Sequence, residues 1–216
     1  MISAIVFDMD GVLVDSEPLS RQAWEQLAAE YHYTLDDETY RQMVGRRTEQ
    51  SVQMFLAACP VPLLPEVVVA RKTAYLDAIR AEVGVPVMPG LDEVLTAVNR
   101  LGLPWAVATS SRRHHAEENM AQLGLSPVII AAGDEVVHGK PAPDIYLLAA
   151  ERLGVSPEVC LAVEDSLPGC QAAMAAGMLV TAVPNGITKN NDFSGVPFVL
   201  ESLYTLAQKL PSIINH

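Results

Sequence analysis

The chain has 216 residues, of which 50% are hydrophobic and only 6% aromatic, and its formal net charge at pH 7 is −12. This length allows one or two domains with a full hydrophobic core. The acidic excess disfavours binding to nucleic acid or to an anionic membrane surface, because no local cluster of Lys and Arg reverses it. We therefore expect a monomer that acts on a small molecule, with no nucleic-acid and no membrane partner.

The cysteines and the amino terminus bear on the compartment. Cys59, Cys160 and Cys170 are widely spaced and form no CxxC pair, which is typical of buried thiols in a reducing compartment. The amino terminus has no basic region of the kind that opens a signal peptide, and no apolar run is long enough to span a membrane. These features predict a soluble, cytoplasmic protein.

The first predicted strand is the apolar run Ser3–Phe7, which leads directly into Asp8-Met-Asp-Gly. The stretch from Pro18 to about Val83 contains no convincing strand. Its amphipathic patterns predict helices at Leu19–Tyr31, Thr48–Ala58 and Glu66–Glu82. We expect a small all-helical domain at residues 17–84, inserted into a core domain that comprises residues 1–16 and 85–216.

After the insertion, helix and strand patterns alternate. The predicted strands are Pro104–Thr109, Val128–Ala132, Val159–Glu164 and Leu179–Pro184, and the predicted helices are Leu91–Leu101, Arg112–Leu123, Ile145–Leu153 and Leu167–Ala176. This alternation predicts an α/β fold with a doubly wound parallel sheet. The last residues, Pro211–His216, are expected to form a loose tail.

Polar side chains follow four of the predicted strands. In chain order these are Asp8 and Asp10, then Thr109, Ser110 and Ser111, then Lys140, and finally Glu164 and Asp165. Ligands of open α/β sheets bind outside the carboxyl ends of the strands, so we expect these side chains to meet at one edge. The sequence therefore predicts a site that combines carboxylates, hydroxyls and one ammonium group.

These motifs, taken in order and each after a strand, resemble the four motifs of the haloacid dehalogenase-like hydrolases. The similar branch contains sugar-phosphate phosphatases and beta-phosphoglucomutase. The resemblance extends from Phe7-Asp8-Met-Asp-Gly-Val-Leu-Val-Asp15-Ser16 to Val163-Glu-Asp-Ser166. It implies a Rossmann-like core with a helical cap, and a Mg²⁺-dependent phosphatase that acts on a small phosphorylated metabolite.

The resemblance also implies a role for each motif. Asp8 would be the nucleophile that forms an aspartyl-phosphate, and Asp10 would be the general acid and base. Asp8, the main-chain carbonyl of Asp10, and Asp165 would bind Mg²⁺, with Glu164 as a possible outer partner.

The remaining motifs concern phosphate and charge. Thr109 and the main-chain amide of Ser110 would hold the transferring phosphoryl group, with Ser111 beside them, and Lys140 would offset the concentrated negative charge. Gly139, Pro141 and Pro143 restrict the backbone around Lys140, and Asp144 is expected to be a helix N-cap. His138 is interpreted as solvated or locally bonded.

Substrate choice is expected to lie in the cap segment Gly45-Arg46-Arg47-Thr48-Glu49. The helix dipole disfavours arginine at a helix amino end, which suggests that another requirement placed Arg46 and Arg47 there. In the resembling family this loop reaches the core site when the cap closes. Gly45, Arg46 and Arg47 are therefore candidate substrate-binding residues.

Other functions compete with this hypothesis. An EF-hand calcium loop needs glycine at its sixth position and a preceding helix, whereas Gly11 is fourth, counted from Asp8, and follows a strand. Haloacid dehalogenases lack a carboxylate at the position of Asp10. The mutase family carries a histidine at the position of Ser20, so serine there favours water as the final acceptor.

Two alternatives stay open: a beta-phosphoglucomutase-type mutase and a non-catalytic binding protein on the same scaffold. Sugar phosphates, phosphoglycolate and nucleotide monophosphates all remain possible substrates.

Overall fold

A parallel sheet forms the centre of the chain, whose computed structural model describes residues 1–44, 46, 48–125, 128–186 and 188–215. In this described part the sheet has six strands in the order β3-β2-β1-β4-β5-β6. They are β1 (Ala4–Phe7), β2 (Trp105–Thr109), β3 (Ile129–Ala132), β4 (Cys160–Glu164), β5 (Leu179–Ala182) and β6 (Phe198–Val199). The predicted α/β fold with a doubly wound parallel sheet is confirmed.

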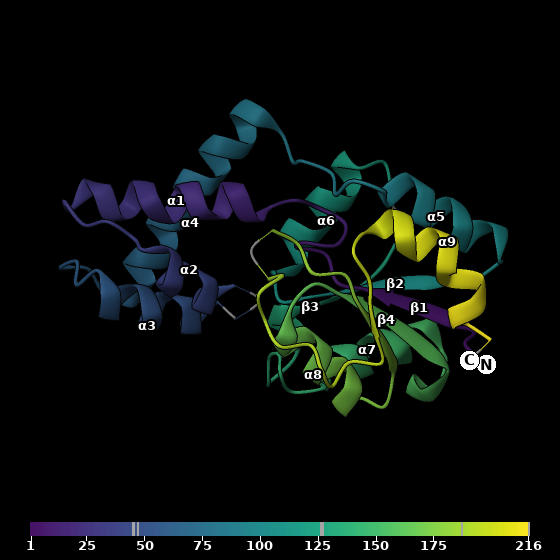
Figure 1. Cartoon of the computed structure of the whole chain (residues 1–216). Coiled ribbons are helices and arrows are strands. Elements are labelled where there is room, and N and C mark those ends of the chain that lie inside the picture. Colours follow the sequence, from purple (N-terminus) through teal and green to yellow (C-terminus); the bar gives the residue numbers. More distant parts are fainter. Residues whose placement is uncertain (45, 47, 126–127, 187, 216) are drawn as a thin grey trace.

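Helices cover both faces of the sheet (Figure 1). On one face lie α5 (Leu91–Arg100), α6 (Arg113–Gln122) and α9 (Leu203–Ile213), and on the other lie α7 (Asp144–Leu153) and α8 (Leu167–Ala175). Successive strand residues alternate between these layers: Phe7 packs with the first group and Val6 with the second. Because both faces are buried, the strands are continuous apolar runs, which is why the sequence revealed them.

Four helices lie to one side of the sheet, at the left of Figure 1: α1 (Glu17–Glu30), α2 (Asp37–Met43), α3 (Thr48–Ala58) and α4 (Pro65–Val83). They form apolar clusters of their own, in which the rings of Trp24 and Phe55 have centroids 4.8 Å apart. This separate packing supports a cap domain at residues 17–84, and its boundaries stay a prediction.

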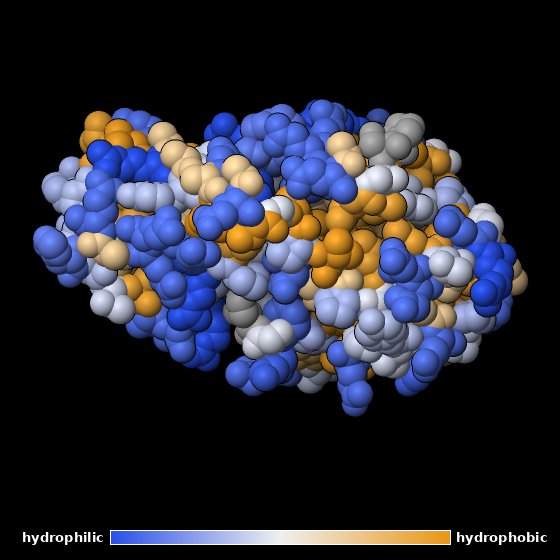
Figure 2. All heavy atoms as spheres, turned by 90° about the horizontal axis from the view of Figure 1, so that it is seen from above, coloured by the Kyte–Doolittle hydropathy of each residue, from blue (hydrophilic) through white to orange (hydrophobic). Residues whose placement is uncertain are grey.

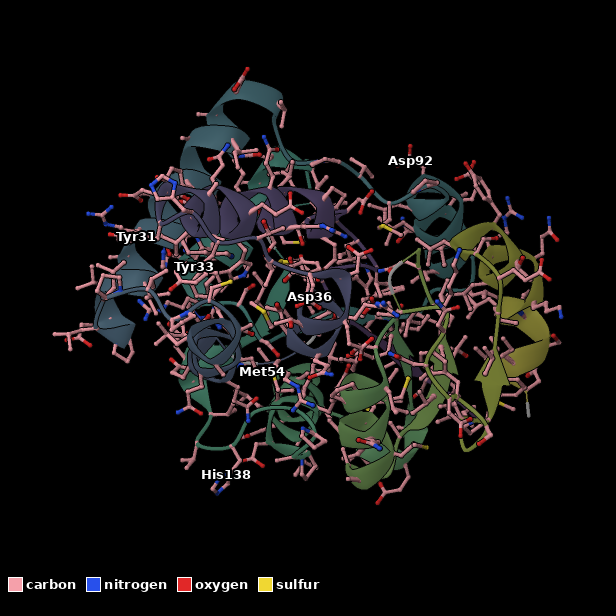
Figure 3. The ribbon with its side chains drawn as sticks, turned by 60° about the vertical axis from the view of Figure 1, so that its left-hand side comes forward. Tyr31, Tyr33, Asp36, Met54, Asp92 and His138 are labelled. Atoms are coloured by element: carbon pink, nitrogen blue, oxygen red, sulfur yellow. The ribbon has the colours of Figure 1, made fainter. Side chains whose placement is uncertain are left out.

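Helix α2 was not predicted from the sequence. It begins after Asp36, labelled in Figure 3, whose carboxylate accepts a hydrogen bond of 2.8 Å from the amide of Thr39. This side-chain cap satisfies one of the amides that a helix start leaves without a partner. The helix has only seven residues, of which Tyr40 and Met43 are buried, so its apolar periodicity is too short to be distinctive.

The predicted loose tail is wrong. Helix α9 extends to Ile213, and Leu210, Ile213 and Ile214 are buried in the core cluster. Pro211 lacks an amide hydrogen, which costs a helix interior about 3 kcal/mol. Burying a large aliphatic side chain contributes about 1.5–3 kcal/mol, so burial of these three residues outweighs that cost. The two-residue strand β6 was also missed, because it is too short to show a pattern.

The surface is uneven in character. In Figure 2 the end formed by α1–α4 is largely hydrophilic, whereas apolar residues gather over the core. Large exposed apolar side chains include Val87, Val199 and Tyr204. Among the described helices, none has the length and apolar character needed to cross a lipid bilayer. The expected monomeric state stays a prediction.

Helix α9 provides a test of the core. Leu206 is fully buried and Tyr204 is 47% exposed on the same helix. We expect Leu206→Ala to lower the free energy of unfolding by about 2–5 kcal/mol, because it leaves a cavity in the layer beside α5. The control Tyr204→Ala should change it by less than about 0.5 kcal/mol. Urea denaturation measures both, and equal effects would contradict the packing described for α9.

Candidate active site

The carboxyl ends of β1, β2 and β4 form the floor of the site. Asp8 follows β1 directly, Thr109 is the last residue of β2, and Glu164 is the last residue of β4. Because β1 pairs in register with both neighbours, these three ends lie side by side. Asp8, Glu164 and Asp165 each offer a carboxylate oxygen within 4.8 Å of the others.

Lys140 lies at the centre of this floor. It comes from the loop between β3 and α7, is only 3% exposed, and donates hydrogen bonds to Asp8 Oδ1 at 2.7 Å and to Glu164 Oε1 at 2.5 Å. Burial alone would lower the pKa of Lys140, but the carboxylates of Asp8 and Glu164 outweigh it and raise that pKa. Lys140 therefore remains a fixed cation in the site.

Glu164 is completely buried and accepts the hydrogen bond from Lys140. Its carboxylate also accepts from the hydroxyls of Tyr146 at 2.7 Å and Ser166 at 2.9 Å. Burial raises its pKa, but Lys140 together with the hydrogen bonds from Tyr146 and Ser166 outweighs burial, so the pKa of Glu164 is lowered and the residue is charged. A Cβ added at Gly169 would lie 1.7 Å from Glu164 Oε1, so α8 can approach this carboxylate only with glycine there.

The site holds more negative than positive charge. Burial is the main cause of the raised pKa of Asp8, about 8, with further contributions from Glu164 and Asp10 against the opposing effect of Lys140. Burial, then Glu164 and Asp8, also raise the pKa of Asp165. A divalent cation would relieve this repulsion, and a cluster of buried carboxylate oxygens is the donor set that suits Mg²⁺.

Asp10 is surrounded by hydroxyl groups. Its carboxylate accepts from Ser16, from Ser111 Oγ at 2.9 Å and from Thr109 Oγ1 at 3.3 Å. Ser16 is at the N-cap position of α1, but its side chain makes no capping hydrogen bond. The Ser16 hydroxyl instead links the start of the helical segment to Asp10.

A pocket of about 150 Å³ lies between the sheet edge and helices α1–α4. The predicted residues that line it are Asp8, Asp10, Arg46, Ser110, Ser111, Lys140 and Asp165. Arg46 comes from the segment after α2, whereas Gly45 and Arg47 lie outside the described residues. The pocket is thus enclosed by both parts of the chain.

The helical segment adds lining residues that the sequence reading missed, among them Glu17, Tyr40, Lys72 and Arg80. Tyr40 donates to Glu17 Oε2 at 2.8 Å. Burial raises the pKa of Glu17 to about 7 and lowers the pKa of Lys72 to about 8. A spacing of eight residues places Lys72 and Arg80 on one face of α4, but nothing local marks that face as turned toward a site.

The residues near Lys140 in the sequence have structural roles. His138 is exposed, and Figure 3 shows it at the edge of the molecule, pointing outward. Asp144 is the first residue of α7 and not its N-cap, a position that Pro143 takes, so that prediction is wrong. The Asp144 carboxylate instead accepts from the His138 amide at 3.2 Å, across the loop that carries Lys140.

The fold and site are those of an α/β enzyme whose ligand pocket lies at the carboxyl edge of a parallel sheet. The family model described as haloacid dehalogenase-like hydrolase matches residues 2–177. The chain therefore belongs to the haloacid dehalogenase-like hydrolases.

Named relatives refine this placement. The chain is 36% identical to the fructose-1-phosphate phosphatase YqaB of Escherichia coli, over 82% of this chain and 93% of the relative. It is 34% identical to hexitol phosphatase A of the same organism, over 92% and 90% of the two chains. The crystal structure of CbbY from Rhodobacter sphaeroides in complex with phosphate has a TM-score of 0.84 at 34% identity, covering 95% of this chain and 96% of that one. The predicted family, branch and enzyme class are confirmed.

Glu17 gives a pH-dependent test of the pocket. Folding raises its pKa from 4.5 to about 7, so the folded state favours the protonated form. Ionisation of Glu17 therefore lowers the free energy of unfolding. This loss is absent below the unfolded-state pKa of 4.5 and complete above the folded-state pKa of about 7. Glu17→Gln cannot ionise, and we expect it to melt roughly 5–10 °C above wild type at high pH, with little difference in acid.

The measurement is differential scanning calorimetry in metal-free buffer at about pH 4 and about pH 8, on either side of the carboxyl transition. A gain of the same size at both pH values would show that Glu17 is not a buried acid.

Proposed function

We propose that this chain is a Mg²⁺-dependent phosphatase that hydrolyses a small phosphorylated metabolite, a sugar phosphate or similar phosphomonoester, through an aspartyl-phosphate. The observation that carries the proposal is the contact of Lys140 with Asp8, 2.7 Å long, among carboxylates that belong to a partly enclosed pocket. The relatives named as sugar-phosphate phosphatases support the reaction class.

In the first step an Asp8 oxygen attacks phosphorus in line, and the bond between phosphorus and the leaving oxygen breaks. Asp10 donates its proton to that oxygen, which leaves as an alcohol. Lys140, Thr109 and the main-chain amide of Ser110 would stabilise the charge on the phosphoryl oxygens as the reaction proceeds.

In the second step water attacks the phosphorus of the aspartyl-phosphate. Asp10, now ionised, accepts a proton from the water while the bond from phosphorus to Asp8 breaks. Inorganic phosphate leaves, and Asp8 and Asp10 return to their initial states. One group thus serves as acid and then as base. The hydroxyls of Ser16, Thr109 and Ser111 donate to the Asp10 carboxylate and hold it in one orientation.

Asp8, the main-chain carbonyl of Asp10, and Asp165 would hold Mg²⁺, with Glu164 as a possible outer partner. When bound, Mg²⁺ neutralises charge on the phosphoryl oxygens and orients them. The contacts of Glu164 with Lys140, Tyr146 and Ser166 indicate that its larger contribution is to fix the lysine.

The pocket favours a small substrate. At about 150 Å³, and with α1–α4 forming its other wall, it has no room for a phosphorylated protein side chain with its backbone. Arg46 lines this wall. We expect it to contact the substrate beyond its phosphate. The same expectation for Gly45 and Arg47 rests on the sequence alone, since both lie outside the described residues. The proposal includes the expectations from the sequence that the protein is soluble, cytoplasmic and monomeric.

A phosphomutase shares the core chemistry and is the second candidate. Ser20 lines the pocket, so the position that carries a histidine in mutases does face the substrate space. The short serine side chain leaves room for water near the acid and favours hydrolysis over transfer to a second sugar hydroxyl.

We expect Asp8→Asn to lower phosphate release by at least about a thousandfold, because the amide cannot act as the nucleophile. Chelation of the metal by EDTA should abolish activity in wild type, and added Mg²⁺ should restore it. A colorimetric phosphate assay over a panel of sugar phosphates measures both, and a melting curve confirms that the variant folds. Full activity of Asp8→Asn would refute the mechanism.

Asp10→Asn separates acid catalysis from structure. A sugar alkoxide needs a proton as it leaves, whereas an activated aryl oxide does not, so we expect a loss of about 10²–10⁴-fold on a sugar phosphate and a much smaller first-step loss on an aryl phosphate. Pre-steady-state release of the aryl group isolates that step. Equal losses on both substrates would mean that Asp10 only supports the architecture around Ser16 and Thr109.

A further inference from the structure

Asn185, which is not among the predicted site residues, donates a side-chain hydrogen bond to the site carboxylate of Asp165. It lies just after β5, the strand next to β4, and its Nδ2 donates to Asp165 Oδ2 at 2.7 Å. Asp165 is only 2% exposed, so this hydrogen bond replaces water on that oxygen. Asn185 does not line the pocket near the phosphate-binding serines, and it acts on the site through Asp165.

A tight turn fixes the orientation of the Asn185 amide. Its side-chain Oδ1 accepts from the main-chain amide of Thr188 at 3.3 Å, while Thr188 Oγ1 accepts from the main-chain amide of Asn185 at 3.0 Å. Thr188 is 2% exposed, so the turn is anchored in the protein. Because the side-chain oxygen is used within the turn, the NH₂ group is the end directed at Asp165.

Gly11 closes the contact from the opposite side. A Cβ added there would lie 2.5 Å from Asp165 Oδ2 and 2.8 Å from Asn185 Nδ2. The backbone of the loop after β1 therefore packs directly on this hydrogen bond and restricts the space of both side chains. Gly11 also has a φ of 88°, which a residue with a side chain rarely adopts.

We propose that Asn185 is a positioning residue for the metal: it holds Asp165 Oδ2 and so presents the other carboxylate oxygen to the cation. A neutral amide suits this task, since it satisfies one oxygen without adding a positive charge that would repel Mg²⁺. Groups that orient a metal ligand typically contribute about 10–100-fold to metal affinity. This inference rests on the proposed function, because it assumes that the site binds a divalent cation.

The test is direct metal binding without substrate. Mn²⁺ is titrated into the full chain and free Mn²⁺ is followed by electron paramagnetic resonance, with Mg²⁺ added as competitor. We expect Asn185→Ala and Asn185→Ser to bind Mn²⁺ and Mg²⁺ about 10–100-fold more weakly than wild type. The control Asn190→Ala removes an exposed asparagine of the same loop and should bind as wild type does.

Asn185→Ser separates positioning from folding. Serine keeps an oxygen that can accept from the Thr188 amide, as serine does in many turns, but it is too short to reach Asp165. We expect its metal-free melting temperature to stay near that of wild type, and its kcat to recover at saturating Mg²⁺. A structural role alone would not produce this separation of metal affinity from stability.

Each other result is decisive. Unchanged metal affinity in both variants would overturn the inference. It would also be overturned if every variant that binds metal more weakly also had a lower metal-free melting temperature than wild type. If wild type itself failed to bind Mn²⁺ or Mg²⁺, the proposed function would fail instead.

Discussion

The buried contact of Lys140 with Asp8 and Glu164 is the interaction on which the rest of the site depends. Lys140 and Glu164 are almost fully removed from water, so neither charge is tolerable without the other. Removing one partner of such a pair typically costs about 3–5 kcal/mol, because it leaves an uncompensated buried charge. Residues of two helices also support the Glu164 carboxylate. Tyr146 of α7 donates a hydrogen bond to it, and Gly169 lets α8 approach it closely.

The concentration of buried carboxylates in the site destabilises the fold but supplies the groups that the proposed reaction needs. One lysine cannot balance the carboxylates of Asp8, Glu164 and Asp165. Burial first, and then repulsion from the neighbouring carboxylates, raise the pKa values of Asp8 and Asp165. The proposed Mg²⁺ would bring the positive charge that offsets both these carboxylates and the phosphate of the substrate. The rigid sheet holds the acidic groups in place, while the helical segment contributes Glu17 and other groups that can tune which substrate is accepted.

The sequence predicted the sheet and the core of the site well, for a physical reason. Strands buried on both faces are short apolar runs, and Asp8 and Glu164 follow or end such runs, so topology alone brings them together. Contacts that depend on tertiary packing were not visible. Asn185 looks like an ordinary turn residue in the sequence, and the burial of the α9 end depends on a layer formed by distant residues. Arg46 was singled out because two adjacent arginines are unusual in an acidic chain, and it lines the pocket, but its role in substrate binding stays a prediction.

The central claim is that the phosphoryl group passes through Asp8. The most direct measurement is the stereochemical course at phosphorus, using an aryl phosphate made chiral with oxygen isotopes and wild-type enzyme with Mg²⁺. Transfer of the phosphoryl group to an alcohol acceptor preserves the chirality for analysis. Two successive in-line displacements, first by Asp8 and then by the acceptor, predict overall retention of configuration. Inversion would mean that the acceptor attacks the substrate directly, and it would contradict the account.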